Sequence, residues 1–194
     1  MNIALIGDGG HAKEVMVQME EELIRFVSDE FYKEKDGVLP LSKFDPKKYR
    51  VLIAVGNSSD RKKILKKLPK ETLFFSFIHP TAQLLGKNIN IGVGSFIGVN
   101  SILTEDINLG NHALLNRGNQ IGHDCNIGDF FSMMPGSILS GNCEIGNEVY
   151  LGTNSSVKEK TSICDKVIVG MCSCVINDVK VSGTYVGSPI KKIK

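Results

Sequence analysis

The chain has 194 residues, a formal net charge of +2 and 42% hydrophobic residues. This length allows one large domain or two small ones, and the small net charge disfavours nucleic acid as a partner. No stretch approaches the ~20 apolar residues of a membrane span, and the opening residues lack the basic and apolar parts of a signal peptide, so we expect a cytoplasmic protein without membrane contact.

Residues 1–80 have the pattern of a small α/β domain. Short apolar runs alternate with polar helical stretches, which is typical of parallel strands joined by helices. The expected elements are strands over 3–6, 24–27, 51–55 and 73–78, helices over 12–23 and 60–68, and a loop over 31–50.

A glycine-rich turn follows the first strand. Residues 7–12 match G-x-G-x-x-A, and Asp29 lies near the end of the second strand, where a dinucleotide fingerprint requires an acid. Such a turn presents backbone N–H groups and a helix N-terminus to phosphate. A second turn at Gly56 ends another strand, so both turns can line one crevice. Because the domain is small, a mononucleotide or nucleotide-sugar is favoured over NAD; a plain strand-to-helix turn is the alternative.

From residue 85 the chain repeats in units of six. Every sixth residue from Leu85 to Val175 is aliphatic or Met, and the next residue is often Gly. Four positions after many anchors comes a small residue, such as Ser95 or Cys125. This is the hexapeptide pattern of a parallel β-helix, with about eighteen residues per triangular coil. We expect anchors and small residues to face inward, and glycines to occupy bends that need positive φ or close backbone approach.

His123 is the candidate catalytic base. It lies just past a bend glycine, so we expect it to project outward with Asp124 beside it. A carboxylate beside an imidazole fixes its tautomer and stabilises its protonated form. One coil on is Gly141, which leaves room for a thioester. The alternative is a solvated corner histidine, which is the favoured interpretation for His112.

Four other features have plainer interpretations. Asn116 replaces a bend Gly, either as a turn residue with positive φ or as a hydrogen-bond donor below His123. Cys125 and Cys143, eighteen residues apart, are expected to stack as small buried side chains. The pair 172/174 has no second ligand pair, so no metal site is predicted. The basic run 61–70 is expected to be a solvated helix face, and the tail 187–194 to cap the coil.

The chain resembles the bacterial nucleotide-sugar N-acetyltransferases and sialic-acid O-acyltransferases of the left-handed β-helix type, the PglD/NeuD group. The matching segments span nearly the whole chain: Ile6–Val15, Ala54–Asn57, Arg61–Ile64, Ile78–Ala82, Leu115–Asn116, Ile121–Asp129, Pro135–Gly136 and Val186–Pro189. The resemblance implies a domain of residues 1–80 that binds a nucleotide-sugar, and a left-handed coil over 81–194. It also implies a homotrimer with sites between neighbouring coils and acetyl-CoA as co-substrate.

The resemblance further implies roles for single residues. His123 would be the general base, and Asp124 would raise its basicity. Acetyl-CoA would lie past Gly141 toward Gly152, Thr153, Gly170 and Met171. The nucleotide-sugar would contact Gly9, Gly10, His11, Asp29, Glu30 and Gly56. Ser132 stands where the family often has a second His; it can donate a hydrogen bond to the cofactor but cannot act as a base.

These observations favour an acetyl-CoA-dependent N-acetyltransferase. Its acceptor would be the amino group of a nucleotide-linked amino sugar, with a 4-amino-4,6-dideoxyhexose as the preferred class. O-acetylation of a sialic acid or another sugar hydroxyl is the alternative within the same class. A non-catalytic scaffold that binds nucleotide-sugars is the alternative from another class.

Overall fold

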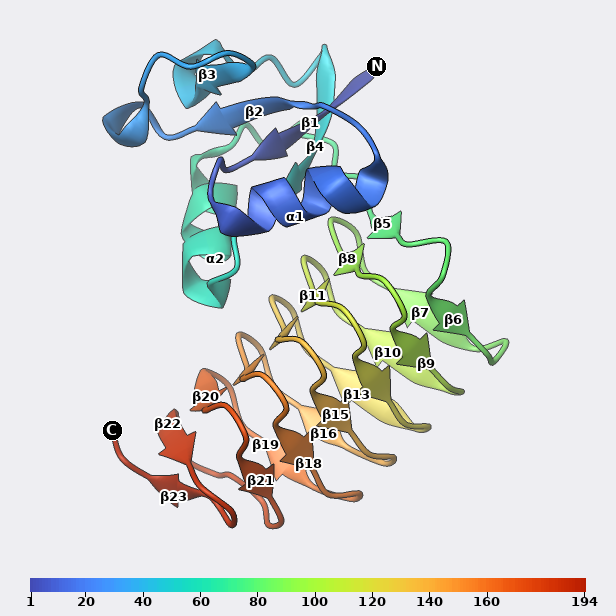
Figure 1. Cartoon of the computed structure of the whole chain (residues 1–194). Coiled ribbons are helices and arrows are strands. Elements are labelled where there is room, and N and C mark those ends of the chain that lie inside the picture. Colours follow the sequence, from blue (N-terminus) through green and yellow to red (C-terminus); the bar gives the residue numbers. More distant parts are fainter.

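The computed structural model describes residues 1–194 and has two units, an α/β unit and a long coil (Figure 1). The α/β unit contains a parallel sheet of order β3-β2-β1-β4. Its elements are β1 (Asn2–Ile6), α1 (Gly10–Met19), β2 (Ile24–Val27), β3 (Val38–Pro40), β4 (Tyr49–Ile53) and α2 (Ser58–Lys67), with 3-10 turns η1 (Asp29–Phe31) and η2 (Leu41–Lys43). The two helices pack on opposite faces of this sheet, α1 against Leu5 and Leu52 and α2 against Ile6 and Ile53.

The expected strands and helices of this unit are present, with three differences. Helix α1 ends at Met19 because Glu20 adopts a left-handed conformation, φ 54°. The expected loop over 31–50 contains β3, which pairs with β2 at the sheet edge, where a strand ending in Pro40 is tolerated. The expected strand over 73–78 is divided: Phe74 bridges to Val51 in the first unit, whereas Phe77 pairs within the coil.

The coil is the left-handed parallel β-helix implied by the resemblance, built from three stacks of short strands. The eight-stranded sheet comprises β5 (Phe77–Ile78), β8 (Phe96–Ile97), β11 (Leu114–Leu115), β14 (Ser132–Met133), β17 (Tyr150–Leu151), β20 (Val167–Val169), β22 (Gly183–Val186) and β23 (Lys191–Lys192). The six-stranded sheet comprises β6 (Gln83–Leu84), β9 (Ile102–Leu103), β12 (Gln120–Ile121), β15 (Ile138–Leu139), β18 (Ser156–Val157) and β21 (Cys174–Val175). The five-stranded sheet comprises β7 (Ile89–Ile91), β10 (Ile107–Leu109), β13 (Cys125–Ile127), β16 (Glu144–Ile145) and β19 (Ser162–Ile163).

The interior of the coil follows the repeat. Strands pair in parallel with partners eighteen residues on, as Ile121 does with Leu139. Anchors from Ile97 to Val175 are buried, whereas Leu85, at the open first coil, is 63% exposed. The small residues are buried too, and Cys125 and Cys143 occupy successive coils as expected. Both helices of the chain are too short and too polar to cross a membrane.

Of the two reasons expected for glycine at the bends, close backbone approach applies and positive φ does not. Those that follow an anchor do not have positive φ; instead a Cβ on Gly122 would lie 2.6 Å from the N atom of Gly141 in the next coil. Close backbone approach therefore requires glycine there. Positive φ falls two residues later in each unit, for example at Asp124 (φ 58°).

The bends stack into three corners, each named here after one residue. The His112 corner comprises residues 92–94, 110–112, 128–130, 146–148 and 164–166. The Asn116 corner comprises 98–100, 116–118, 134–136, 152–154 and 170–172. The His123 corner comprises 104–106, 122–124, 140–142, 158–160 and 176–178. The first unit lies against the His112 and Asn116 corners, and the His123 corner is on the opposite edge (Figure 1).

Candidate functional site

A cleft of ≈ 770 Å³ opens at the carboxyl ends of the strands in the first unit. The turn after β1, the start of η1 after β2 and the turn after β4 form its walls. This is the usual ligand position in an open parallel sheet. Of the residues expected to contact the nucleotide-sugar, five line the cleft: Gly9, Gly10, His11, Glu30 and Gly56.

Asp29 does not line this cleft, which corrects the expectation from the glycine fingerprint. Its Oδ1 atom accepts a hydrogen bond from Ser42 Oγ at 2.6 Å, so the carboxylate ties η1 to η2. The adjacent Glu30 and Phe31 face the cleft instead. The fingerprint places an acid at the end of the second strand, but the 3-10 turn that begins there decides which side chain points inward.

Four lysines around the cleft were not expected. They come from the loop after η1 and from α2: Lys33, Lys35, Lys63 and Lys67. Lys35 Nζ lies 2.7 Å from Asp8 Oδ2, and Arg25 Nε lies 2.9 Å from Asp8 Oδ1. Lys63 and Lys67 lie four residues apart and so share one face of α2. That spacing, within a run interpreted as a solvated face, was the available signal that both lysines face the cleft.

His11 joins the cleft to the coil. Its ring lies edge-on to Phe96, with centroids 5.3 Å apart, and its Nδ1 is 3.8 Å from Glu14 Oε2. Burial, reinforced by the nearby Arg61 guanidinium, lowers the pKa of His11 to about 4. The imidazole is therefore neutral near pH 7 and presents a dipole rather than a charge to the cleft.

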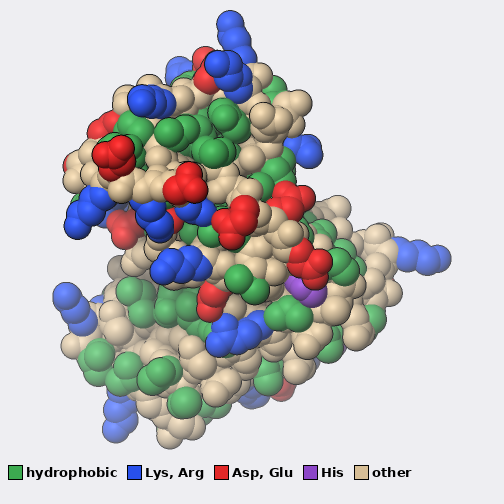
Figure 2. Space-filling model, turned by 45° about the horizontal axis from the view of Figure 1, so that its top comes forward, with side chains coloured by type: hydrophobic (Ala, Val, Ile, Leu, Met, Phe, Trp, Pro, Cys, Tyr) green, Lys and Arg blue, Asp and Glu red, His purple; other side chains and the backbone are tan.

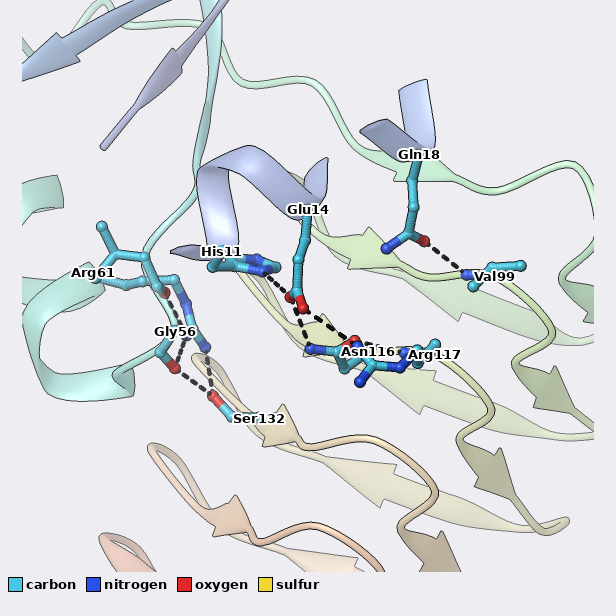
Figure 3. Close-up of polar contacts among 10 residues, drawn as sticks. His11, Glu14, Gln18, Gly56, Arg61, Val99, Asn116, Arg117 and Ser132 are labelled. Carbon is cyan, nitrogen blue, oxygen red and sulfur yellow. Dashed lines mark hydrogen bonds and ion pairs between the residues drawn. The ribbon is translucent and has the colours of Figure 1, made fainter. Parts of the chain in front are cut away.

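Arg61 is the central contact between the two units (Figure 3). It is 2% exposed and donates to atoms from both: Val55 O, Gly56 O, His112 O, Phe130 O, Phe131 O and Ser132 Oγ, at 2.9–3.2 Å. Burial lowers its pKa to about 10, so it stays charged. The basic run 61–70 placed Arg61 on an expected solvated face. Its position three and four residues before Ile64 and Leu65 was the overlooked sign that it faces inward.

Two predicted ligand contacts belong to this junction instead. Ser132 is fully buried, and its Oγ lies 2.9 Å from Ser58 Oγ, so it is not accessible to a cofactor. Asn116 neither has positive φ nor lies below His123. Its Oδ1 accepts from Arg117 N at 2.7 Å, and its Nδ2 lies 3.4 Å from Glu14 Oε2 (Figure 3).

His123 lies in an exposed bend, as expected, and 61% of its side chain is exposed. Its Nδ1 is 2.6 Å from Asp124 Oδ2. A carboxylate at this distance fixes the proton on Nδ1 and leaves the Nε2 lone pair free to accept another. A Cβ on Gly141 would lie 2.8 Å from Nε2. Gly141 therefore allows the imidazole to lie against the next coil, and the space expected for a thioester is partly filled by the ring itself.

Backbone N–H groups differ between the corners. Along the His112 corner, the N–H groups of Asn111, Asp129 and Asn147 each donate to an Asp or Asn side chain of the next coil. The equivalent N–H of Gly141 has no acceptor in the chain, although the residue is buried. Orphan donors in buried residues are rare, and this N–H is free to donate to a further acceptor.

Other predicted cofactor contacts lie apart from His123. Gly152, Thr153, Gly170 and Met171 belong to the Asn116 corner. On a single chain they do not form one surface with Gly141, and they would have to approach His123 from a neighbouring subunit. Their contact with acetyl-CoA therefore stays a prediction that requires a neighbouring subunit.

A second groove lies between the N-terminus of α2 and the coil. It measures ≈ 720 Å³ and is lined by Asn57–Ser59 on one side and by coil side chains on the other: Met134, Glu148, Tyr150, Lys166 and Ile168. Figure 2 shows the hollow between the two units, with hydrophobic side chains gathered on the coil beside it.

Comparison with known proteins confirms the resemblance found from the motifs. Residues 2–68 match the family model described as the PglD N-terminal domain. No curated protein sequence gives a significant match. Over its whole length, the chain is similar to solved structures of 25–28% sequence identity.

Three of these structures illustrate the likeness. PerB from Caulobacter crescentus, in complex with CoA and GDP-perosamine, is 25% identical, with TM-score 0.90 and 100% and 98% of the two chains covered. WeeI from Acinetobacter baumannii AYE is 28% identical, with TM-score 0.89 and both chains fully covered. The acetyltransferase domain of PglB from Neisseria gonorrhoeae FA1090, in complex with acetyl coenzyme A, is 25% identical, with TM-score 0.87 and 99% and 98% covered.

Proposed function

We propose that this chain transfers the acetyl group of acetyl-CoA to the amino group of a nucleotide-linked amino sugar, with His123 as the general base. The full-length likeness to PerB and the PglB domain supports a sugar acetyltransferase that uses acetyl-CoA. The single observation that supports a nucleotide-linked acceptor and His123 as the base is an exposed His123–Asp124 pair on the same chain as a cleft lined by lysines.

The cleft supports nucleotide-sugar recognition by residues 1–80. The turn at Gly9 and Gly10 opens directly into α1, whose N-terminus favours phosphate. Four lysines line it together with the acids Asp8, Glu30 and Asp60. Three of the lysines form ion pairs with these acids, which leaves an excess of one positive charge. The exposed ring of Phe31 offers a flat surface for a base. We assign the transfer step to residues 81–194.

The residues around His123 suit acyl transfer. Acetyl-CoA supplies an acetyl group on a thioester carbon. Nε2 of His123 accepts the proton that the sugar amine loses as its nitrogen bonds to that carbon. Asp124 stabilises the resulting imidazolium, and the orphan N–H of Gly141 donates to the thioester oxygen, where negative charge grows.

The acceptor and the base come from different chains in this proposal. The cleft lies in the first unit, which packs on the His112 and Asn116 corners, whereas the His123 corner lies on the opposite edge of the coil. A sugar held in the cleft therefore meets the imidazole of a neighbouring copy, and we propose the homotrimer implied by the motif resemblance. The groove beside Tyr150 and Ile168 is a suitable surface for that neighbour.

The direct test combines His123→Ala with a panel of acceptors. Free thiol released from acetyl-CoA is measured with UDP-, GDP- and dTDP-linked amino sugars and with the matched hydroxyl sugars. We expect release with a 4-amino-4,6-dideoxyhexose and at least a hundredfold loss in the variant. His79→Ala is the control. Near-normal turnover in His123→Ala refutes the base assignment.

The same panel separates the alternatives. Release only with hydroxyl sugars would favour O-acetylation. No release with any acceptor, together with binding of a nucleotide-sugar, would favour the scaffold.

Complementation between subunits tests the shared site. Gly9→Glu places a carboxylate in the cleft, and a Cβ at Gly9 meets no atom within 4 Å, so the fold is preserved. Chains with His123→Ala and chains with Gly9→Glu are each expected to be inactive. Mixed oligomers should regain activity, because some sites combine an intact cleft with an intact base. Absence of recovery in verified mixed oligomers contradicts the arrangement.

A further inference from the structure

We propose that the cleft of the first unit selects guanine as the base of the nucleotide-linked acceptor, and that Glu30 determines this choice together with Lys67. The inference rests on the proposed function, because it takes the nucleotide to occupy this cleft. It names the base, which the glycine fingerprint leaves open, from a side chain that η1 directs into the cleft.

The two ends of the cleft differ in chemistry. At one end, the turn at Gly9 and Gly10 opens into α1, and Gly56 follows the neighbouring strand β4, which suits a diphosphate. At the other end, η1 carries Glu30 and Phe31 beside the last turn of α2. The ring of Phe31 is 75% exposed and offers a flat face to a base. The phosphates are therefore assigned to the glycines and the base to η1.

Helix α2 connects these two ends. Asp60 lies in its first turn, close to Gly56, whereas Lys67 is its last residue. The helical rise places Lys67 ~10 Å beyond Asp60 along the axis. A ribose and one phosphate span a comparable length between the base and the terminal phosphate of a nucleoside diphosphate. The ion pair of Asp60 with Lys63 thus belongs to the phosphate end, and Lys67 belongs to the base end.

Glu30 and Lys67 form one hydrogen-bonding edge. Lys67 Nζ lies 3.2 Å from Glu30 Oε1, so the pair bridges α2 and η1. The two side chains are 51% and 60% exposed for Lys67 and Glu30, so both polar groups are accessible to a ligand. Their contact uses one N–H of the ammonium group and one lone pair of Oε1, and leaves the others free. The edge therefore presents a donor followed by two acceptor oxygens.

Guanine alone among the common bases satisfies all three positions of this edge. Its O6 accepts from Lys67, and its N1–H and N2–H groups donate to the two oxygens of Glu30. Uracil and thymine have a single N–H between two carbonyls, so one carboxylate oxygen would face a carbonyl oxygen. Adenine and cytosine, in either orientation, leave a carboxylate oxygen without a donor. Unpaired or repulsive contacts on these edges select against the other bases.

The experiment measures equilibrium binding of free nucleoside diphosphates to the full-length protein by calorimetry, with no acetyl-CoA present. The probes are GDP, IDP, UDP and dTDP, and IDP differs from GDP only in lacking the N2 amino group. The test variant is Glu30→Gln. The control, Glu34→Gln, removes the same charge from the loop after η1 at a residue that does not line the cleft. Unchanged thermal unfolding verifies the fold of both variants.

We expect the wild-type protein to bind GDP at least ~10-fold more tightly than UDP or dTDP, and about tenfold more tightly than IDP. The Glu30→Gln amide replaces one acceptor of the edge with a donor, which matches the acceptor, N–H, acceptor order of uracil. GDP binding should therefore fall at least ~10-fold in this variant while UDP binding rises. The Glu34→Gln control should keep the wild-type order and affinities.

Three outcomes overturn the assignment of the base and leave the proposed function standing. They are wild-type affinity for UDP or dTDP that equals or exceeds that for GDP, a ratio of GDP to UDP affinity in Glu30→Gln equal to that of wild type, and an equal change in the Glu34→Gln control. If the wild-type protein binds none of the four diphosphates, the nucleotide-linked acceptor of the proposed function fails as well.

Discussion

Acid should destabilise this protein through His112. Its ring is 4% exposed, stacks on Phe130 with centroids 5.2 Å apart and lies edge-on to Phe74 at 4.7 Å. Its buried Nδ1 has no hydrogen-bond partner. Burial, with the nearby Arg61 adding to it, lowers the pKa of His112 from 6.5 to about 4. The neutral ring is thus part of the junction between the two units.

The sign and size of the effect follow from linkage. Between these two pKa values the unfolded chain binds a proton at this position and the folded chain does not. The contribution is complete above pH 6.5 and is lost as the pH falls toward about 4. The whole difference is worth ~3.4 kcal/mol, of which ~2 kcal/mol is lost between about pH 7 and about pH 5.

Urea unfolding of wild type and His112→Asn at those two pH values checks this. Asn does not titrate and tolerates the positive φ of 55° at this bend. The variant is less stable at both pH values because it loses the aromatic contacts, but its stability should fall by ~2 kcal/mol less on acidification. His11 titrates in the same direction in both proteins and cancels. Equal pH dependence in the two proteins would refute the reasoning.

Three further substitutions probe the junction and the site. Arg61→Met should lower the free energy of unfolding by about 3–5 kcal/mol, because buried carbonyls of both units lose their donor; calorimetry measures this, and a loss below ~1 kcal/mol would contradict the role. Gly141→Ala places a Cβ 2.8 Å from Nε2 of His123, so kcat should fall at least ~10-fold with little change in Tm, whereas an unaltered kcat would count against the site. Asp124→Asn keeps a residue suited to φ 58° but removes the carboxylate, so kcat should fall by about 10²-fold across the pH profile; a drop confined to KM would be the wrong outcome.

The coil could be predicted from sequence because its determinants are local and repeated. Each unit places one anchor inside, and sixteen anchors in one register leave no alternative phase. That register alone assigns Gly141 to the position next to His123. The positive φ at Asp124 could not, because the sequence marks that slot with Asn, Asp, Gly, Lys and Phe alike.

The junction between the units could not be predicted in the same way. Arg61, Ser132 and Asn116 each follow local patterns that have ordinary surface or turn interpretations. Their contacts join residues about 70 to 100 positions apart, and no repeat relates the first unit to the coil. Burial of a guanidinium depends on carbonyls that both units turn toward it, and that is a property of the assembled pair.

The three faces of the coil have different surfaces, and this difference supports the proposed trimer. The five-stranded sheet carries a polar ladder outward, in which Asn90, Asn108, Asn126 and Glu144 are linked by hydrogen bonds of 2.8–2.9 Å, so water suffices to cover it. The first unit covers the upper strands of the eight-stranded sheet. On the six-stranded sheet, Ile138, 39% exposed, lies between the polar residues Gln120 and Ser156, and this sheet borders the His123 corner. A partner that covers this sheet would bring its own surface up to the imidazole, as the proposed shared active site requires.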